Sequence, residues 1–281
     1  MSNLNLPQMT NFLLDLLPKT GDILMSYFSS DHLSVRYKSK RDIVTEADLA
    51  VDEFLQNNLR SKYPQIPILS EETYSGNFAD YQNKKLLWVI DPLDGTTNFS
   101  RKLPHFAVSV ALVSDKKPLI GVVYQPVYKN LFWANKESDG AFGNGKKLNV
   151  SKIDRLEEAV VCSDWSHNLK THDDTIRIIK KLDGHVRSIK MMGSAVSDLM
   201  NLACGKIEAY HHIQLMPWDG AAASLIAEKA GAKVTDTKGG NWNVFTPGLL
   251  VANKIIHKKI LSLFGRGDGR ENFFRRRNLL A

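Results

Sequence analysis

Apolar residues recur every three or four positions in two segments near the N-terminus. The first covers residues 9–28, and Pro18 inside it is expected to kink or divide the predicted helix. The second predicts a helix over about 46–61. Further along, the apolar residues form short runs separated by turn-forming residues. These runs predict an antiparallel meander of strands at 108–113, 119–124 and 131–134.

The second half of the chain alternates predicted strands with predicted helices, which is typical of the α/β fold class. The strands are expected near 159–162, 207–211, 233–235 and 249–252, and the helices near 173–182, 195–203 and 220–230. We expect residues 1–145 to form an N-terminal half with two helices and an antiparallel sheet. Residues 146–281 are expected to form a C-terminal α/β half. The glycines at Gly140, Gly143 and Gly145 mark the expected boundary.

The positive charge of the chain is concentrated at its C-terminal end. The formal net charge is +7 over 281 residues, and residues 254–281 hold three Lys and five Arg against two acidic residues. The remainder of the chain is therefore close to neutral. We interpret the basic tail, residues 265–281, as a solvated terminus. The alternatives are that it binds RNA, a membrane surface or an acidic partner.

Cysteine content and hydropathy indicate the cellular setting. Cys162 and Cys204 are too few for a disulfide framework and suit a reducing compartment. The first residues lack a basic stretch followed by an apolar core, and no apolar run is long enough to span a bilayer. We therefore expect a cytoplasmic protein without membrane segments.

Residues 86–99 combine an apolar strand with a polar turn. The apolar run 86–90 predicts a buried strand, which ends at Asp91 and Asp94. Two carboxylates this close repel when both are ionised, so either one holds a proton or a cation lies between them; hard oxygen ligands favour Mg²⁺. Gly95 and the polar residues 96–98 are suited to begin a short helix whose N–H groups face a phosphate. The alternative is a surface turn rich in Asp and Gly.

Three other segments contribute acidic residues. Glu71 and Glu72 follow a short apolar run and predict either a shared site with the first pair or a solvated strand edge. Asp219 precedes four small residues and is expected to cap the helix that they begin. Thr45 and Asp48 have the spacing of a capping box, which leaves Asp48 open between a cap partner and a group that orients a water molecule.

Together these segments resemble the inositol monophosphatase family of magnesium-dependent, lithium-sensitive phosphatases, including its bacterial extragenic-suppressor branch. The resemblance covers nearly the whole chain. It implies a layered αβαβα sandwich of the inositol monophosphatase and fructose bisphosphatase type, with the active site between two halves and usually a homodimer. It rests on Asp91-Pro92-Leu93-Asp94-Gly95-Thr96-Thr97-Asn98-Phe99, Glu71-Glu72, Trp218-Asp219 with its Ala-rich helix, and Asp42-Ile43-Val44-Thr45-Glu46-Ala47-Asp48.

The resemblance also implies a set of metal ligands. Glu71, Asp91 and the backbone carbonyl of Leu93 would hold a first Mg²⁺ ion, and Asp91, Asp94 and Asp219 would hold a second. A carboxylate shared by two cations lowers the repulsion between them. Family members often bind a third, weaker ion near Glu71. The expected cofactor is therefore two or three Mg²⁺ ions per site.

The remaining implied roles concern catalysis and the substrate. Thr96 and Asp48 resemble the pair that positions the attacking water, and the N–H groups of Gly95 and Thr96 would receive the phosphate. Gly193-Ser194-Ala195 matches the second substrate-contacting segment of the family. Family members that act on inositol phosphates usually carry an acidic residue where this chain has His212. A protonated His212 would suit a second phosphate or a carboxylate, and the alternative is a structural histidine.

Two classes of function follow. The first is a Mg²⁺-dependent phosphomonoesterase that hydrolyses a small phosphorylated metabolite by direct attack of a metal-activated water. Inositol 1-phosphate is the first expectation; the alternatives are histidinol phosphate, a sugar phosphate or bisphosphate, and 3′-phosphoadenosine 5′-phosphate. The second class is a protein that binds RNA or the transcription machinery through its basic tail, because some bacterial relatives bind that machinery.

Overall fold

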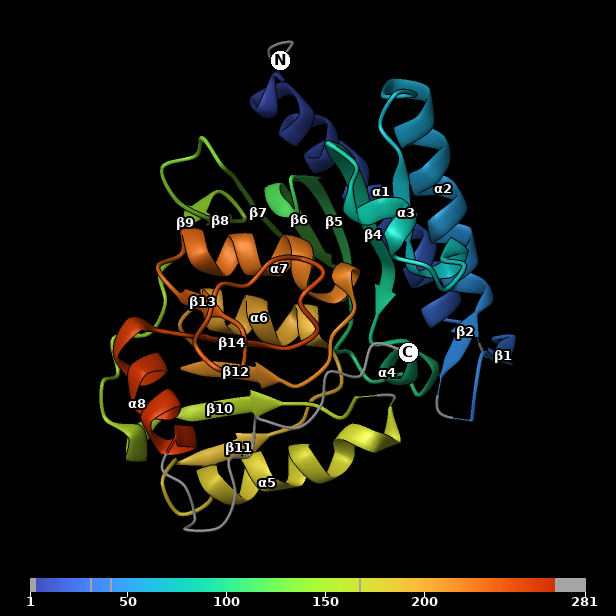
Figure 1. Cartoon of the computed structure of the whole chain (residues 1–281). Helices are drawn as coiled ribbons and strands as arrows, with labels where there is room; N and C mark the ends of the chain where they lie inside the picture. The colour runs from blue at the N-terminus through green and yellow to red at the C-terminus, as the bar shows by residue number, and fades with distance from the viewer. Residues whose placement is uncertain (1–3, 31, 41, 167, 266–281) are drawn as a thin grey trace.

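Two β-sheets lie between three layers of helices (Figure 1). The computed structural model of the chain describes residues 4–30, 32–40, 42–166 and 168–265. Helices α1 and α2 cover one face of a seven-stranded sheet, α6 and α7 fill the space between that sheet and a five-stranded sheet, and α5 and α8 cover the outer face of the smaller sheet. The layered αβαβα sandwich that the sequence predicted is therefore confirmed.

The outer helical layer of the N-terminal half consists of α1 (Leu6–Phe28) and α2 (Glu46–Lys62). Asn5 caps α1 by accepting a hydrogen bond from the backbone N–H of Gln8 at 3.0 Å. Pro18 does not divide α1, although a proline inside a helix removes one backbone hydrogen bond. One face of α1 is deeply buried against the sheet, and this burial outweighs the loss. A hairpin of β1 (Val35–Tyr37) and β2 (Ile43–Thr45) precedes α2.

The seven-stranded sheet has the order β3-β4-β5-β6-β7-β8-β9. Strands β3 and β4 pair in parallel and the following pairs are antiparallel, as the predicted meander requires. The strands are β3 (Ile68–Ser70), β4 (Leu86–Asp94), β5 (Ala107–Ser114), β6 (Lys117–Gln125), β7 (Asn130–Asn135), β8 (Phe142–Gly143) and β9 (Lys146–Lys147). The short helices η1 (Glu71–Thr73), α3 (Ala79–Gln82) and α4 (Thr96–Ser100) connect them.

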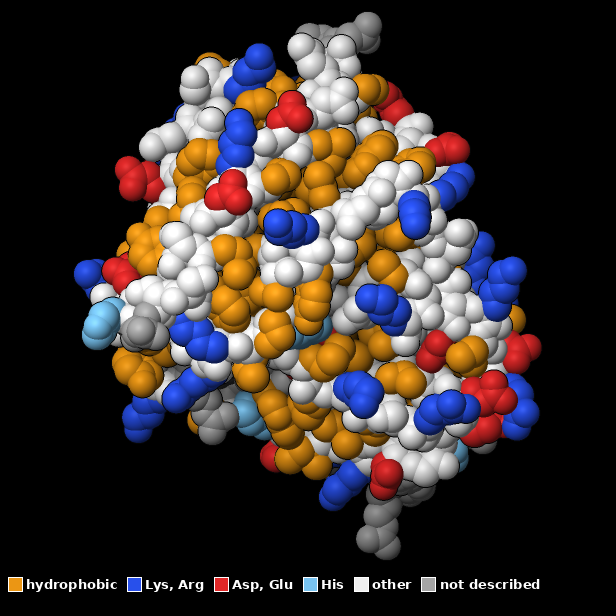
Figure 2. Space-filling model, turned by 180° about the vertical axis from the view of Figure 1, so that it is seen from behind, with side chains coloured by type: hydrophobic (Ala, Val, Ile, Leu, Met, Phe, Trp, Pro, Cys, Tyr) orange, Lys and Arg blue, Asp and Glu red, His pale blue; other side chains and the backbone are white. Residues whose placement is uncertain are grey.

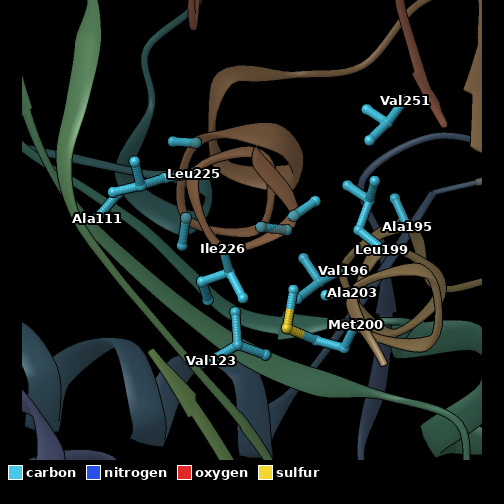
Figure 3. Packing of buried hydrophobic residues seen from close by; sticks show 14 of the residues in the cluster. Ala111, Val123, Ala195, Val196, Leu199, Met200, Ala203, Leu225, Ile226 and Val251 are labelled. Carbon is cyan, nitrogen blue, oxygen red and sulfur yellow. The ribbon is translucent and has the colours of Figure 1, made fainter. Parts of the chain in front are cut away.

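The central layer consists of α6 (Ala195–Ala203) and α7 (Pro217–Lys229). Figure 3 shows their side chains packed between the sheets, with Ile226 of α7 and Met200 of α6 beside Val123 of β6. Residues 220–227 of helix α7 are buried on all sides because protein surrounds this part of the helix. A Cβ atom at Gly121 of β6 would lie 2.5 Å from the carbonyl oxygen of Ala222, so glycine allows this close approach of helix and sheet.

The five-stranded sheet has the order β11-β10-β12-β14-β13. Strand β10 pairs in parallel with both β11 and β12, whereas β14 pairs antiparallel with β12 and β13. The elements of this region are η2 (Leu156–Glu158), β10 (Val160–Ser163), η3 (Leu169–Thr171), α5 (His172–Leu182), β11 (Ser188–Lys190), β12 (Ala209–His212), β13 (Lys233–Thr235), β14 (Leu249–Ala252) and α8 (Lys254–Gly265). Its outer core joins β10, β12 and β14 to α5 and α8.

Helix α8 was not anticipated from the sequence, where residues 254–264 were considered only for the charge of the C-terminal end. Ile256, Ile260 and Phe264 form its buried face, and the lysines at 254, 258 and 259 are exposed. Beyond Gly265 the tail lies outside the described residues. Within the described ranges, no helix combines the length and the apolar character needed to cross a membrane.

Candidate metal and phosphate site

The end of β4 carries the first two carboxylates. The pairing of β4 with β5 is irregular between Asp91 and Asp94, and both side chains are buried, with 1% and 9% of their residue surface exposed. Oδ1 of Asp91 accepts a hydrogen bond from the backbone N–H of Leu93 at 3.1 Å. Oδ2 of Asp91 is buried and has no hydrogen-bond partner among the described residues. A buried carboxylate oxygen without a donor is an available cation ligand.

Asp219 joins this pair from the first turn of α7. Carboxylate oxygens of Asp91, Asp94 and Asp219 all lie within 4.8 Å of one another. Burial and the neighbouring negative charges raise the pKa of Asp91 and of Asp219 well above the ordinary value for aspartate. Three hard oxygen ligands in one cluster could hold a divalent cation, and without a cation the raised pKa values indicate that the cluster keeps a proton, so both sequence alternatives fit this geometry.

The position of Asp219 in its helix differs from the prediction. The helix was expected to begin at Gly220 with Asp219 as its cap, but α7 begins at Pro217 and Met216 occupies the N-cap position. The carboxylate of Asp219 instead reaches back and accepts a hydrogen bond from the backbone N–H of Met216 at 2.9 Å. Proline favours the first turn of a helix because it has no N–H to leave unpaired there, so the helix begins earlier.

Glu71 and Glu72 lie in η1, directly after β3, and both contact Lys38. The Nζ atom of Lys38 lies 3.0 Å from Oε1 of Glu71 and 2.8 Å from Oε2 of Glu72. Burial, followed by the charge of Glu71, raises the pKa of Glu72 to about 8 even though Lys38 opposes this shift. Glu71 is close enough to Asp91 to raise its pKa. The structure therefore brings both acidic segments to one site, with a lysine at its edge that the sequence analysis gave no role.

Thr45, Asp48 and Thr96 form a hydrogen-bonded group beside the carboxylates. Oδ2 of Asp48 accepts hydrogen bonds from the backbone N–H of Thr45 at 2.9 Å and from the Thr45 hydroxyl. Oδ1 of Asp48 lies 2.9 Å from the hydroxyl of Thr96, which also lies 3.0 Å from the carbonyl oxygen of Leu93. Burial raises the pKa of Asp48 to about 6. Asp48 thus closes a capping box and contacts Thr96 at the same time.

Gly95 and the segment 193–196 complete the inner wall. Gly95 has a φ of +92°, and a Cβ atom there would lie 3.0 Å from the carbonyl oxygen of His105 and 3.2 Å from Cβ of Ser194. The hydroxyl of Ser194 donates a hydrogen bond to Oδ2 of Asp94, which also accepts one from the backbone N–H of Val196 at 3.0 Å. Because burial outweighs these bonds, the pKa of Asp94 rises to about 6. The support that Ser194 gives Asp94 was not predicted.

These residues surround one pocket of about 750 Å³. All the site residues expected from the sequence line it, with the exception of Asp48, which lies behind Thr96. His212 lines the outer part, and its Nδ1 atom accepts a hydrogen bond from the backbone N–H of Gln214 at 3.1 Å. The ring proton of a neutral His212 is therefore on Nε2. The lining set is Glu71, Asp91, Leu93, Asp94, Gly95, Thr96, Gly193, Ser194, Ala195, His212 and Asp219.

A second group of ionisable residues adjoins this pocket and was not found from the sequence. Nε2 of His105 lies 2.9 Å from Oδ1 of Asp198, and Asp198 is completely buried. Oδ1 of Asp164 accepts a hydrogen bond from the backbone N–H of Gly193 at 2.9 Å. Burial and the charge of Asp198 raise the pKa of Asp164 to about 7. The amide of Asn98 donates to the carbonyl oxygens of His105 and Met192, each at 2.8 Å, and links the two groups.

Comparison with known proteins agrees with this geometry. The sequence profile of the Inositol monophosphatase family matches residues 5–267. Inositol monophosphatase from Dictyostelium discoideum is 32% identical over 266 residues, covering 94% of this chain and 97% of that protein. Nus factor SuhB from Escherichia coli K12 is 34% identical over 248 residues, covering 87% and 91%.

The crystal structure of extragenic suppressor protein suhB from Bartonella henselae superposes with a TM-score of 0.85 at 31% identity. The superposition covers 92% of this chain and 99% of that one. The fold, the acidic pocket and these similarities lead to one conclusion: the chain belongs to the inositol monophosphatase family and is a phosphatase of that type.

Proposed function

We propose that the protein is a Mg²⁺-dependent phosphomonoesterase that hydrolyses a small phosphorylated metabolite with two or three bound Mg²⁺ ions. The observation that carries this proposal is the cluster of Asp91, Asp94 and Asp219, in which one buried oxygen of Asp91 has no hydrogen-bond partner among the described residues. A buried anionic cluster of this kind is costly unless cations neutralise it. Its position in a pocket beside Thr96 and Gly95 provides space for a phosphate group.

In this proposal the carboxylates form two sets of ligands that share Asp91. Glu71, Asp91 and the carbonyl oxygen of Leu93 would hold one ion, and Asp91, Asp94 and Asp219 would hold another. When bound, the ions supply a water of lowered pKa and stabilise the charge that develops on the phosphate and the leaving oxygen. Lys38 lies against Oε1 of Glu71 in the structure, so a cation would compete with Lys38 for that oxygen or bind Glu71 through the other one.

Thr96 and Asp48 would orient the attacking water. The Thr96 hydroxyl has one proton, and its two acceptors are Oδ1 of Asp48 at 2.9 Å and the carbonyl oxygen of Leu93 at 3.0 Å. With that proton donated to Asp48, the lone pairs of the hydroxyl are available to accept a hydrogen bond from the water. The water would attack phosphorus in line with the departing alkoxide, so no covalent phosphoenzyme is formed.

Gly95 and the start of α4 would bind the phosphate. The left-handed backbone of Gly95 begins α4, and its N–H and that of Thr96 are suited to contact phosphate oxygens. Gly193-Ser194-Ala195 would contact the remainder of the substrate from the opposite side, because Gly193 and Ser194 face Gly95. The backbone on both sides therefore approaches the reacting group closely.

The family similarity favours inositol 1-phosphate as the first substrate to test. His212 argues against it, because an Nε2–H group donates a hydrogen bond where a carboxylate would accept one from a sugar hydroxyl. Histidinol phosphate, sugar phosphates or bisphosphates, and 3′-phosphoadenosine 5′-phosphate are the alternatives.

The test is phosphate release by the purified full-length protein with Mg²⁺, measured across these substrates. Asp94→Asn removes one proposed ligand and keeps the volume of the side chain. We expect this variant to lose several orders of magnitude in turnover while its circular dichroism is unchanged. Asp139→Asn is the matched control, because the Asp139 side chain is 78% exposed and pairs only with Lys147 among the described contacts. Near-normal turnover by Asp94→Asn would refute the assignment.

A second function is supported by relatives named Nus factor SuhB and by the basic sequence of the C-terminal tail. We propose, as the alternative, that the tail binds RNA or the transcription machinery. On the face shown in Figure 2, Lys and Arg side chains are scattered and form no continuous basic patch, so the tail is the better candidate for such contacts. Truncation after Phe264 should abolish RNA binding if this alternative holds. The alternative is favoured if Asp94→Asn leaves the cellular phenotype intact.

We further propose a homodimer in the cytoplasm. Figure 2 shows apolar side chains gathered across the face behind the view of Figure 1, and broad exposed apolar surfaces often mark contacts between subunits. Light scattering of the purified protein tests this directly. A mass equal to one chain over a wide concentration range would contradict it.

A further inference from the structure

Two backbone segments from different halves of the fold approach each other beside the proposed phosphate position. Gly95 follows β4 of the seven-stranded sheet, and Gly193 precedes α6 of the central layer. A Cβ atom at Gly95 would lie 3.0 Å from the carbonyl oxygen of His105, 3.2 Å from Cβ of Ser194 and 3.3 Å from the carbonyl oxygen of Gly193. The space around Gly95 therefore depends on where the segments of His105 and Gly193 are held.

The side-chain amide of Asn98 contacts both of these carbonyl groups. Asn98 lies in α4 and is 8% exposed. Its Nδ2 atom lies 2.8 Å from the carbonyl oxygens of His105 and Met192, and 3.3 Å from that of Gly193. Only a donor can satisfy carbonyl oxygens, so these partners fix the orientation of the amide. One side chain thus joins the segment after α4 to the segment before α6.

Asn98 also packs against the open side of Gly193. The φ angle of Gly193 is +76°, and a Cβ atom there would lie 3.2 Å from Nδ2 and 3.3 Å from Oδ1 of Asn98. The peptide group between Met192 and Gly193 is held at its carbonyl by Asn98 and at its N–H by Oδ1 of Asp164, at 2.9 Å. Contact and hydrogen bond together therefore place this peptide relative to α4.

Loss of the amide would release this arrangement. The carbonyl groups of His105 and Met192 would each lose a buried partner, and carbonyl oxygens that meet without a donor between them repel one another. They would turn or separate until water satisfies them. Either movement changes the distance between Gly95 and Gly193, which are proposed to lie on the two sides of the substrate.

The support of the metal ligand Asp94 does not depend on Asn98. Asp94 accepts its hydrogen bonds from the hydroxyl of Ser194 and from the backbone N–H of Val196 at 3.0 Å. A separate contact, 2.9 Å between Nε2 of His105 and Oδ1 of Asp198, also joins the two halves. These links remain when the amide is removed, so its loss is expected to act on phosphate binding more than on metal binding.

We propose that Asn98 is a positioning residue whose amide sets the separation of Gly95 from Gly193, and with it the fit of the phosphate group between them. This inference rests on the proposed phosphatase function and adds a residue that acts through the backbone. Asn98 is not a catalytic residue in this proposal, because its hydrogen bonds go to backbone carbonyl groups of the protein.

Inorganic phosphate is the probe, because it occupies the phosphate position without turnover. Its binding to the full-length protein in saturating Mg²⁺ is measured by calorimetry. Asn98→Ala removes both N–H donors, and we expect it to weaken phosphate binding about tenfold, the equivalent of one net hydrogen bond. We expect kcat/KM to fall by about tenfold to a hundredfold, because a small displacement of binding groups is costly in the transition state. The Mg²⁺ concentration for half-maximal activity should change by no more than about twofold, because the bonds to Asp94 are kept.

Asn253→Ala is the matched control. Asn253 is 6% exposed, and its Nδ2 atom donates a hydrogen bond to the carbonyl oxygen of Ile153 at 2.8 Å, across 100 positions of the sequence. It is not among the described residues that line the pocket. This variant should lose stability, as Asn98→Ala does, and should bind phosphate like the wild type.

Three results would overturn the proposal. They are unchanged phosphate binding by folded Asn98→Ala, equal weakening in Asn253→Ala, and a shifted Mg²⁺ dependence without loss of phosphate affinity. If Asn98→Ala does not fold, Asn98→Ser replaces it. Its hydroxyl has one proton and cannot serve both His105 and Met192, so a smaller loss of phosphate affinity is expected and an unchanged affinity would overturn the proposal.

Failure of the proposed function is recognised separately. If the wild type releases no phosphate from any substrate in a Mg²⁺-dependent manner, the phosphatase function fails and the role of Asn98 in it fails as well. If the wild type is active and Asn98→Ala matches it in phosphate affinity and kcat/KM, only the role of Asn98 is wrong.

Discussion

Ser194→Ala is the substitution that most directly separates the stability of the fold from the organisation of its metal ligands. The Ser194 hydroxyl caps α6 by accepting a hydrogen bond from the backbone N–H of Ser197 at 3.2 Å, and it donates a hydrogen bond to Oδ2 of Asp94. Alanine removes both bonds with little change of volume. Because Ser194 is only 2% exposed, water does not readily replace the lost hydroxyl.

The magnitudes follow from these contacts. Loss of an N-cap costs about 1 kcal/mol, and loss of a hydrogen bond to a charged acceptor costs about 1.5–3 kcal/mol. Asp94 keeps the hydrogen bond from the backbone N–H of Val196 at 3.0 Å, so it is not left without a donor. We therefore expect the free energy of unfolding to fall by about 2.5 kcal/mol, the lower end of the sum of these two losses. Loss of a partner that orients a metal ligand weakens metal affinity by about 10–100-fold, and the remaining bond favours the lower value.

The assay is phosphate release as a function of Mg²⁺ concentration, together with urea unfolding of the same protein without metal. Ser194→Ala should need about tenfold more Mg²⁺ for half-maximal activity. Asn5→Ala is the matched control, because Asn5 caps α1 through an equivalent bond to the N–H of Gln8 at 3.0 Å. It should lose about 1 kcal/mol of stability and keep its Mg²⁺ dependence. An unchanged Mg²⁺ dependence in Ser194→Ala, or a shifted one in Asn5→Ala, would refute the reasoning.

Three further predictions concern stability. Burial lowers the pKa of His257 to about 4, so the unfolded chain protonates first and the free energy of unfolding falls as the pH drops from about 6.5 to 4. His257→Gln, which keeps a hydrogen-bonding group for Thr235, should reduce that fall by about 3 kcal/mol in urea titrations, and an unchanged fall would count against it. Pro18→Ala should raise the free energy of unfolding by about 2 kcal/mol because it restores a helical N–H, and a loss would show that Pro18 is favourable in α1. Gly121→Ala should lower the melting temperature and cost about 1–3 kcal/mol, because its Cβ would press on the backbone of Ala222, whereas an unchanged melting temperature would show that α7 can move away.

The sequence predicted the elements that have a strong local pattern. The bounds expected for β13, β14 and α6 agree with the structure, because each is a short apolar run or a buried helix with clear ends. Helix α8 has an equally regular pattern, with Ile256, Ile260 and Phe264 four residues apart. It was missed because its lysines were considered only for the charge that residues 254–281 carry, and the apolar spacing between them was not examined.

The candidate site was predictable only where its residues follow strand ends or helix starts. The convergence of Asp91, Asp94 and Asp219 could be expected from such positions. The hydrogen bond from Ser194 to Asp94 joins residues 100 positions apart, and no local pattern indicates it. The same holds for the pair of His105, in the segment before β5, and Asp198 of α6, which lie 93 positions apart in the sequence. Long-range contacts of this kind depend on the whole topology of the sandwich.

The central claim is that Asp91, Asp94 and Asp219 hold Mg²⁺ for phosphoester hydrolysis, and calorimetric titration of the full-length protein with Mg²⁺ tests it most directly. The account predicts at least two ions per wild-type chain, because Asp91 is proposed to bridge two sites. It predicts the loss of at least one of them in Asp91→Asn, with the fold retained in circular dichroism. Absence of Mg²⁺ binding by the wild type, or the same stoichiometry and affinity in Asp91→Asn, would contradict the account.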